Sequence, residues 1–220
     1  MKGIQRVGVL TLGVPILAAV SAATAEQAVG HWKFNEGTGN VAHDSSGRNN
    51  DGEIVNAKWT SGPSPGSAAL AFRDYATSNP PPAGPTYVRA KNRDGLNPTK
   101  GFDISANVYV DPSFSPQFAA AVVEKGEGYG CSYRLLMTSD LRVEAVAGNE
   151  HAILLSSTKL TLGKWTATRV TYDGRTLKVY IDGREDASVA VQTRNLSSED
   201  DVIIGKRFTG KLADIVIATE

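Results

Sequence analysis

Short runs of alternating apolar and polar residues, each followed by turn residues, constrain this chain most. In the run 164–172, every second residue, Trp165 among them, falls on one face, because successive side chains of a strand point to opposite sides. Alternation alone does not decide which face is buried. The pair Asp173-Gly174 follows this run, and such pairs supply the positive φ angles of tight hairpin turns. We therefore predict an antiparallel hairpin over residues 164–181.

Similar runs fill most of the chain, and no long window outside the N-terminal segment has the 3.6-residue apolar stripe of a helix. The other runs are 29–34, 67–72, 86–90, 102–110, 119–125, 132–138, 141–147, 152–157, 201–206 and 212–218. Many short strands without helices predict an all-β fold, a two-sheet antiparallel jelly-roll sandwich. The proline-rich piece 78–85 is expected to be a surface loop, too short to separate domains. We expect a single domain over residues 26–220.

The N-terminal segment has the pattern of a secretory signal. Lys2 and Arg6 precede an apolar run over 7–20, and the small residues SAATA follow it. The run is shorter than the ~20 apolar residues that a membrane helix needs, and no later run approaches that length. We therefore expect a signal peptide over residues 1–25 and a secreted or periplasmic protein without a membrane span.

Charge and cysteine content narrow the classes of partner. The chain has 23 basic and 23 acidic residues, so it lacks the dense positive charge that phosphate backbones require, and we expect no nucleic-acid role. Cys131 is the only cysteine and has no partner within the chain, so the stability of the fold must come from its hydrophobic core. We expect Cys131 to be a small buried side chain; an intermolecular disulfide or a reactive thiol is the alternative.

Several phrases in a fixed order resemble the laminin-G-like, concanavalin A-like jelly-roll domains of secreted bacterial proteins. They include GHWKFNEGTGNVAHDSSGRNNDGEI, FDISANVYVDP, VTYDGRTLKVYIDGRE and IIGKRFTGKLADIVI, and they cover nearly the whole chain after the signal. The fold of this family hosts lectins, binding modules, glycoside hydrolases and polysaccharide lyases, so it does not fix an activity. The resemblance implies packing roles for Trp32, Phe34, Phe102, Ile104, Ala106, Val108 and Trp165.

The segment 43–53 concentrates oxygen-bearing side chains and glycines in a short loop, which suits calcium. In domains that look like this one, an acid at the position of Asp44, loop carbonyls and an acid on the last strand hold a structural calcium. The resemblance therefore implies a site formed by Asp44, Asn50, Gly52 and Asp214. The alternative is a plain turn in which the Asp44 side chain bonds to its own backbone.

A glycan-binding surface is the next expectation, because relatives with this fold hold sugars on one sheet. Sugar recognition needs aromatic faces and planar hydrogen-bonding groups. We predict that a polysaccharide or a glycoprotein glycan is the partner and that side chains of these types meet on one surface. They are Asn107, Tyr109, Tyr133, Arg134, Arg142 and Glu144, with Tyr75 and Tyr129 on loops. An ordinary solvated sheet face is the alternative, and many relatives carry an aromatic residue where this chain has Asn107.

Motifs of catalysis are missing from the sequence. It contains no G-x-S-x-G, no H-E-x-x-H, no phosphate-binding loop, and no strand resembling the E-x-D-x-E of related glucanases. We therefore predict a non-catalytic carbohydrate-binding module. The alternative is a polysaccharide lyase that cleaves a uronate polymer by β-elimination, with His151, Tyr133 and Arg142 as its candidate catalytic residues.

Overall fold

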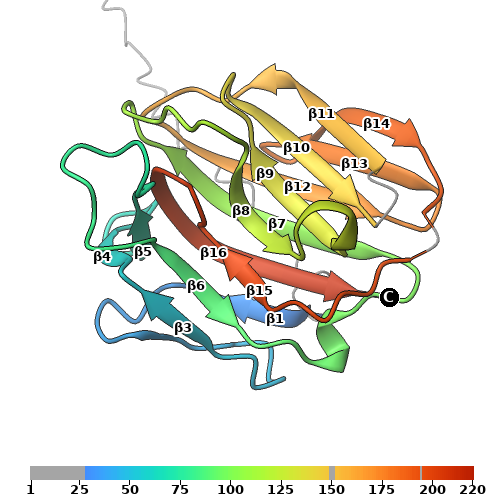
Figure 1. The fold of residues 1–220 in the computed structure, drawn as a ribbon, viewed down its shortest axis with the longest axis horizontal. Helices are drawn as coiled ribbons and strands as arrows, with labels where there is room; N and C mark the ends of the chain where they lie inside the picture. Colours follow the sequence, from blue (N-terminus) through green and yellow to red (C-terminus); the bar gives the residue numbers. More distant parts are fainter. Residues whose placement is uncertain (1–27, 149–151, 194) are drawn as a thin grey trace, which may run out of the picture.

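The computed structural model describes residues 28–148, 152–193 and 195–220, which form two antiparallel sheets of 8 strands each (Figure 1). Sheet A has the order β14–β13–β12–β7–β16–β5–β4, and β1 also pairs with β16. Sheet B has the order β11–β10–β9–β8–β15–β6–β3–β2. The strands of sheet A are β1 (Ala28–Trp32), β4 (Lys58–Ser61), β5 (Ala68–Phe72), β7 (Phe102–Val110), β12 (Trp165–Tyr172), β13 (Thr176–Ile181), β14 (Arg184–Ala190) and β16 (Gly210–Thr219). Those of sheet B are β2 (Val41–Ala42), β3 (Gly52–Val55), β6 (Tyr87–Ala90), β8 (Ala120–Lys125), β9 (Tyr133–Met137), β10 (Arg142–Ala147), β11 (Ala152–Lys159) and β15 (Val202–Ile204).

This architecture confirms the predicted all-β jelly-roll sandwich. The described helical structure is two single 3-10 turns, η1 (Asp94–Leu96) and η2 (Gly128–Gly130). Sheet B lies in front of sheet A in Figure 1, and one hydrophobic core fills the space between them. Phe102 of sheet A meets Tyr133 of sheet B with ring centroids 5.6 Å apart, and Tyr172 lies 5.9 Å from Phe102. Offset aromatic contacts of this kind stabilise a core by about 1 kcal/mol beyond the area they bury.

The predicted hairpin over residues 164–181 is confirmed as β12 and β13. Tyr172 pairs with Leu177 across the turn. The Asp173 carboxylate accepts hydrogen bonds from the backbone N–H groups of Arg175 (2.9 Å) and Thr176 (2.8 Å), and Gly174 has a φ of 89°. The turn chemistry therefore fixes the register of the two strands.

The structure also shows which faces are buried. In β12 the inward residues are Thr166, Thr168, Val170 and Tyr172, while Trp165 is only partly buried on the outer face of sheet A. Trp165 therefore packs at the outer face of sheet A, where its ring contacts Tyr109, and not in the core between the sheets. The implied inward face of β7 is confirmed, since its members Phe102, Ile104, Ala106 and Val108 are all buried.

Strand β8 departs from simple alternation through a β-bulge. Ala121 pairs with Leu136 on β9, and the next pair joins Val123 to Leu135, so Val122 is an extra residue. Such an insertion changes the face to which the following side chains point. Both valines are buried, and Glu124 then points to the outer face of sheet B.

Lys125, the next residue, enters the core as a consequence of the same bulge. Its ammonium group donates hydrogen bonds to Asn92 Oδ1 and to the main-chain oxygen of Asp200, both at 2.6 Å. Burial lowers the pKa of Lys125, against the opposing attraction of Asp200 and Asp201. A buried ammonium must have such partners, because an unpaired one costs several kcal/mol.

Strands β11 and β14 are the end strands of sheets B and A, and one side chain links them. The Asp186 carboxylate on β14 accepts hydrogen bonds from the backbone N–H groups of Ser157 and Thr158 on β11, and from the Thr158 hydroxyl. Burial raises the pKa of Asp186, but these hydrogen bonds outweigh it and lower the pKa overall.

Cys131 is fully buried, as expected for a small packing residue. Its Sγ donates to the main-chain oxygen of Gly148 at 3.2 Å. It packs with Ala121, Leu136 and Val146 in a small second cluster on the outer side of sheet B. Burial raises the pKa of the thiol, so the less nucleophilic protonated form is favoured.

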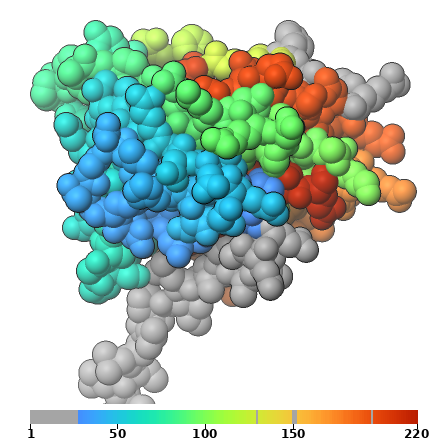
Figure 2. Space-filling model, turned by 90° about the horizontal axis from the view of Figure 1, so that it is seen from below, coloured from blue at the N-terminus to red at the C-terminus, as the bar shows by residue number. Residues whose placement is uncertain are grey.

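The start of the described chain lies against its end. Strand β1 pairs antiparallel with β16, and Figure 2 shows the blue N-terminal segment beside the red C-terminal strand. The predicted signal peptide, residues 1–25, lies outside the described residues. Among the residues that are described, no helix has the length and apolar character needed to cross a bilayer.

Candidate functional site

The outer face of sheet B carries a pocket of about 320 Å³ across its central strands. We call it the β8–β10 pocket. Glu124 on β8 is opposite Arg134 on β9, and Leu136 on β9 is opposite Glu144 on β10, so all four side chains reach the same face. The lining combines these strands with the two loops that flank β8 and the loop between β15 and β16, and it includes Phe118, Glu124, Glu127, Arg134, Leu136, Glu144 and Arg207.

An aromatic residue stands at the rim of this pocket. Phe118, in the loop before β8, is 69% exposed, the largest exposure of any described large hydrophobic side chain. Leu136 provides an apolar floor and is itself almost completely buried. An exposed aromatic ring beside an aliphatic floor is typical of a surface that contacts a ligand.

Glu124 is the most unusual polar group of the pocket. It is only 2% exposed, and its Oε1 has no hydrogen-bond partner among the described residues. Lys206 Nζ lies 3.6 Å from Oε1, and Arg134 Nε lies 4.0 Å from Oε2, both beyond hydrogen-bonding distance for these groups. Burial raises the pKa of Glu124, and the positive charges of Lys206 and Arg134 oppose the rise without cancelling it.

The cations around Glu124 are held by other groups. Arg134 Nε donates to the main-chain oxygen of Gly126 at 3.0 Å, which fixes the guanidinium over β8. Lys206 donates a very short hydrogen bond to Glu127, and Arg207 lies 3.7 Å from the same carboxylate. Arg207 Nε is buried and has no hydrogen-bond partner in the part of the chain that is described. The pocket therefore offers an open acceptor and an open donor at fixed positions.

Asn107 and Tyr109, predicted to share a surface with Arg134 and Glu144, lie on the opposite side of the molecule. Both belong to β7, on the outer face of sheet A. The prediction of one common surface is wrong, because alternation assigns a residue to a face of its strand but not to one of the two sheets. Tyr109 is in contact with Trp165 (5.6 Å between centroids), and the Lys211 ammonium lies 4.8 Å from its ring.

The prediction that Tyr133 contributes to the binding surface is also wrong. Tyr133 points into the core, is completely buried, and its hydroxyl finds no hydrogen-bond partner among the described residues. Arg134, the next residue on β9, takes the outer face instead. Burial raises the pKa of the Tyr133 hydroxyl, so the proton stays on it at any physiological pH.

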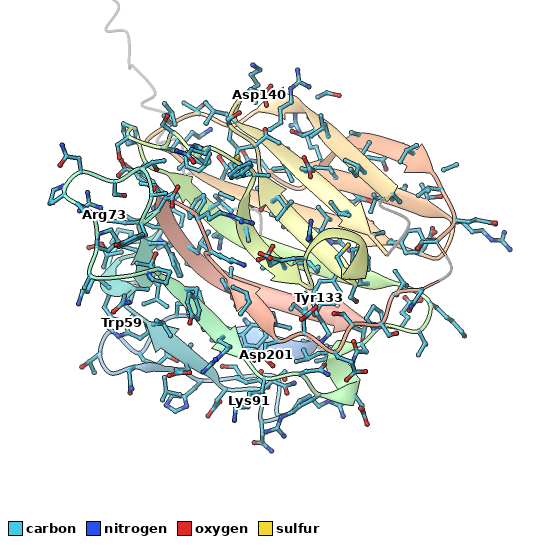
Figure 3. All side chains as sticks on the ribbon, viewed as in Figure 1. Trp59, Arg73, Lys91, Tyr133, Asp140 and Asp201 are labelled. Atoms are coloured by element: carbon cyan, nitrogen blue, oxygen red, sulfur yellow. The ribbon has the colours of Figure 1, made fainter. Side chains whose placement is uncertain are left out.

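The other predicted binding residues are scattered. Arg142 shares the outer face of sheet B but binds Asp140 (3.1 Å) and the main-chain oxygen of Ser156 (2.8 Å). Tyr75 is 55% exposed and lies two residues after Arg73, which Figure 3 shows well away from Tyr133. His151 and the side chain of Tyr129 lie outside the described part of the chain.

The predicted calcium residues form a hydrogen-bonded turn around Asp44. Its Oδ1 accepts the backbone N–H groups of His31 (2.9 Å) and Ser46 (2.8 Å), and its Oδ2 accepts the Asn50 N–H (2.9 Å) and the Ser46 hydroxyl (2.8 Å). Burial raises the pKa of Asp44, and the hydrogen bonds from Asn50, Ser46 and His31 together lower it below its usual value.

This arrangement does not fit calcium as it stands. Two hydrogen bonds on each Asp44 oxygen use the lone pairs that a cation would need. Asp214 Oδ1 lies 2.8 Å from His31 Nε2, and the main-chain oxygen of Asn50 accepts the Trp32 indole N–H at 2.8 Å. Within the described ranges, no three His, Cys, Asp or Glu side chains are grouped for a metal. The prediction that Asp44, Asn50, Gly52 and Asp214 bind calcium stays untested.

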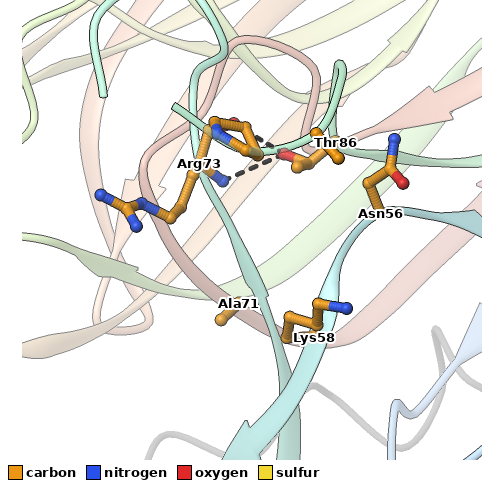
Figure 4. A pocket seen from close by; sticks show the side chains of 7 residues that line it. Asn56, Lys58, Ala71, Arg73 and Thr86 are labelled. Carbon is orange, nitrogen blue, oxygen red and sulfur yellow. Dashed lines mark hydrogen bonds between the residues drawn. The ribbon is translucent and has the colours of Figure 1, made fainter. Parts of the chain in front are cut away.

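A second pocket, of about 240 Å³, lies between β4, β5 and the proline-rich loop (Figure 4). Its polar groups do not converge. The Thr86 hydroxyl donates to the main-chain oxygen of Arg73 (2.9 Å) and accepts its N–H (3.0 Å), and the Arg73 guanidinium points away from Lys58 and Asn56 in Figure 4. The β8–β10 pocket is therefore the stronger candidate.

Phe118 and Glu124 are the main residues of the candidate site that sequence reasoning did not select; Glu127, Leu136 and Arg207 were not selected either. Glu124 stood out only as a charged residue in an apolar run, and the bulge at Val122 that turns it outward has no sequence signature. Phe118 lies in a loop, where no periodicity exists to read. The sequence PQFAAAVVE does place a large aromatic residue directly before a buried strand.

Comparisons with known proteins agree with the fold. A family model described as the concanavalin A-like lectin/glucanases superfamily matches residues 82–218. Domain 4 of AbnA, a GH43 extracellular arabinanase from Geobacillus stearothermophilus solved with arabinotriose, is 16% identical with a TM-score of 0.65, over 88% of this chain and 92% of that one.

Two further solved structures contain the same fold as part of a longer chain. The binding domain of botulinum neurotoxin serotype D is 12% identical (TM-score 0.66, 90% of this chain and 49% of that one). Trypanosoma rangeli sialidase, solved with a difluoro-KDN, is 16% identical (TM-score 0.59, 87% and 30%). At these identities the likeness shows the fold alone. No curated protein sequence matches the chain.

Proposed function

Because the chain belongs to the concanavalin A-like lectin/glucanases superfamily, we propose that it binds a polysaccharide or a glycoprotein glycan in the β8–β10 pocket without altering it. The observation that carries the proposal is Phe118, an aromatic ring 69% exposed at the rim of a pocket that contains Glu124 and Arg134. These are the two kinds of group that sugar recognition combines.

A sugar ring has an apolar face of C–H groups and an edge of hydroxyls. The Phe118 ring and the Leu136 floor suit the first, while the carboxylates of Glu124 and Glu144 and the guanidinium of Arg134 suit the second. Four of these side chains project from adjacent strands of one sheet, so the scaffold holds them in place before a ligand arrives. Preorganisation of this kind reduces the entropy lost on binding.

The structural neighbours support this proposal in a general way. The arabinanase domain was solved in complex with arabinotriose, and cell entry of botulinum neurotoxin type C depends on interaction with two ganglioside molecules. The match covers 49% of that toxin chain, so the arabinanase domain, which is matched over 92% of its length, gives the more direct support. The residues of its own pocket determine which glycan this chain binds.

Two of the three candidate residues of the lyase alternative are not placed for catalysis, and the third, His151, lies outside the described part of the chain. A lyase needs a side chain that removes a proton from the sugar, and Tyr133 is sealed in the core. Arg142 is engaged with Asp140 and Ser156 rather than turned toward a substrate. We therefore favour binding without chemistry, and the same experiment measures both.

Export is a separate part of the proposal. A signal over residues 1–25 would place the chain in the periplasm or the medium, where polysaccharides and surface glycans are met. A calcium ion at the Asp44 turn would act on the stability of the fold rather than on this pocket, because that turn lies beside β2 and β3 at the far edge of sheet B.

The test is retention of soluble polysaccharides by the protein, with new unsaturated or reducing ends measured in the same incubation. We expect retention without new ends, and we expect Phe118→Ala to weaken it about fivefold or more, since one stacked ring contributes about 1 kcal/mol beyond the area it buries. Tyr109→Ala, on the outer face of sheet A, is the matched control and should bind normally. Equal loss in both variants, or new unsaturated ends, would contradict the proposal.

A further inference from the structure

The surroundings of Glu124 indicate which chemical groups a ligand of the β8–β10 pocket must have. Glu124 is 2% exposed, faces into the β8–β10 pocket, and its Oε1 has no hydrogen bond from any described residue. A buried acceptor without a partner costs about 1–3 kcal/mol. A ligand that donates a hydrogen bond to this atom recovers that cost on binding.

The neighbouring cation defines the second requirement. Arg134 Nε is 4.0 Å from Glu124 Oε2, too far for a direct hydrogen bond, although the charges attract. Arg134 is held in place by its bond to the main-chain oxygen of Gly126. That bond uses the only hydrogen on Arg134 Nε, so the guanidinium can donate to a ligand only through its two terminal amino groups. Arg134 and Glu124 therefore lie side by side without satisfying each other. A hydroxyl accepts from one and donates to the other at once.

The pocket as a whole is close to neutral. The carboxylates of Glu124, Glu127 and Glu144 face the positive groups of Arg134, Arg207 and Lys206. Lys206 and Arg207 share the Glu127 carboxylate and Arg134 lies 4.0 Å from that of Glu124, so among the described residues each positive group of the pocket already has a carboxylate beside it. A carboxylate on the ligand would lie near the buried charge of Glu124 and could donate nothing to it.

Resting on the function proposed above, we infer that the β8–β10 pocket selects neutral glycans. A hydroxyl of the sugar binds between Arg134 and Glu124, and sugars that carry a carboxylate or a sulfate at that position are rejected. A uronate-containing polymer, the substrate class of the lyase alternative, is then the wrong ligand. Like charges brought together in a desolvated site cost several kcal/mol, so the selection is strong.

The experiment uses oligosaccharides in matched pairs: a glucan with a glucuronan, a galactan with a galacturonan, and a mannan with a mannuronan. Affinities for the full chain are measured by calorimetry at pH 7. We expect the neutral member of whichever pair binds to be at least about tenfold tighter than its acidic counterpart. Phe118→Ala must weaken that binding, which assigns it to this pocket.

Two variants isolate the role of the carboxylate. Glu124→Gln keeps an acceptor but removes the charge, so we expect the preference for the neutral member to fall severalfold. Glu124→Ala removes the acceptor and should weaken the neutral ligand itself. Melting temperatures show whether each variant folds. A pH series on the wild type is independent of folding defects: the preference should narrow as Glu124 becomes protonated, and burial raises its pKa.

The outcomes separate this inference from the proposed function. Tighter binding of the acidic member, still weakened by Phe118→Ala, would overturn the selection of neutral sugars and leave the binding site standing. Equal affinity for both members, unchanged in Glu124→Gln, would overturn it too. Binding that Phe118→Ala leaves intact, or no binding in any pair, would remove the proposed site and this inference together.

Discussion

The outer faces of the two sheets carry similar residues in different states. On sheet A, Arg169 binds Asp103 through two of its nitrogens and lies over the Tyr180 ring at 5.2 Å, and Lys211 covers Tyr109. On sheet B, Glu124 Oε1 and Arg207 Nε have no such partners among the described residues. Composition alone would rank the aromatic face of sheet A first. A side chain already satisfied by its neighbours has little to offer a ligand.

The same contrast extends to the Asp44 turn, the most completely satisfied carboxylate of the described chain. We expect Asp44→Ala to lower the free energy of unfolding by roughly 3 kcal/mol, because it leaves backbone N–H groups of His31, Ser46 and Asn50 without their acceptor. Denaturant unfolding measures this loss. Glycan binding by the folded fraction should not change.

Chelation and acid separate this account from a calcium site. If hydrogen bonds to Asp44 stabilise the turn, a chelator leaves the wild-type melting temperature unchanged; a clear fall would support the calcium prediction instead. Because the folded state lowers the pKa of Asp44 below 3.8, its contribution is complete above that value. It is lost as the pH falls from about 4 through the lower pKa of the folded state, which unfolding curves at successive pH values would show.

A matched pair of carboxylates tests the two faces directly. We expect Asp103→Asn to lower stability by about 1 kcal/mol, because it removes the charge that holds Arg169, and to leave glycan binding intact. Glu124→Gln should hold or raise stability, since burial disfavours the ionised form of this side chain. Thermal unfolding of both variants and of the wild type measures these two changes in stability. A stability loss at Glu124 equal to that at Asp103 would remove the distinction between satisfied and open groups.

The smallest effect concerns the core between the faces. Tyr133→Phe removes a buried hydroxyl that has no hydrogen-bond partner in the described structure, so we expect a gain of up to about 1 kcal/mol, or about 2–4 °C in melting temperature. Glycan binding should stay the same. A loss of stability would mean that the hydroxyl has a partner after all, and a loss of binding would return Tyr133 to the candidate site.

The sequence predicted the architecture well because alternation and turn chemistry are local. Asp173-Gly174 fixed a hairpin from its own residues, and the inward face of β7 followed from period two once the family was recognised. The site depended on non-local facts. Tyr133 and Arg134 are neighbours in the chain, and only the packing of sheet A decides which one is buried. The bulge at Val122 turns Glu124 outward, and nothing in AAVVEK signals it.

The hydrogen bonds from β11 to the Asp186 carboxylate bear on how this protein resists aggregation through its edge strands. The last strand of a sheet presents free N–H groups that a strand from another molecule can extend, and this is how many β proteins aggregate. A single carboxylate occupies two of those groups at Ser157 and Thr158, in the place of a ninth strand. Acid strong enough to protonate Asp186 would free these N–H groups to pair with a strand of another molecule. We therefore expect the protein to lose its solubility at the same pH at which these hydrogen bonds break.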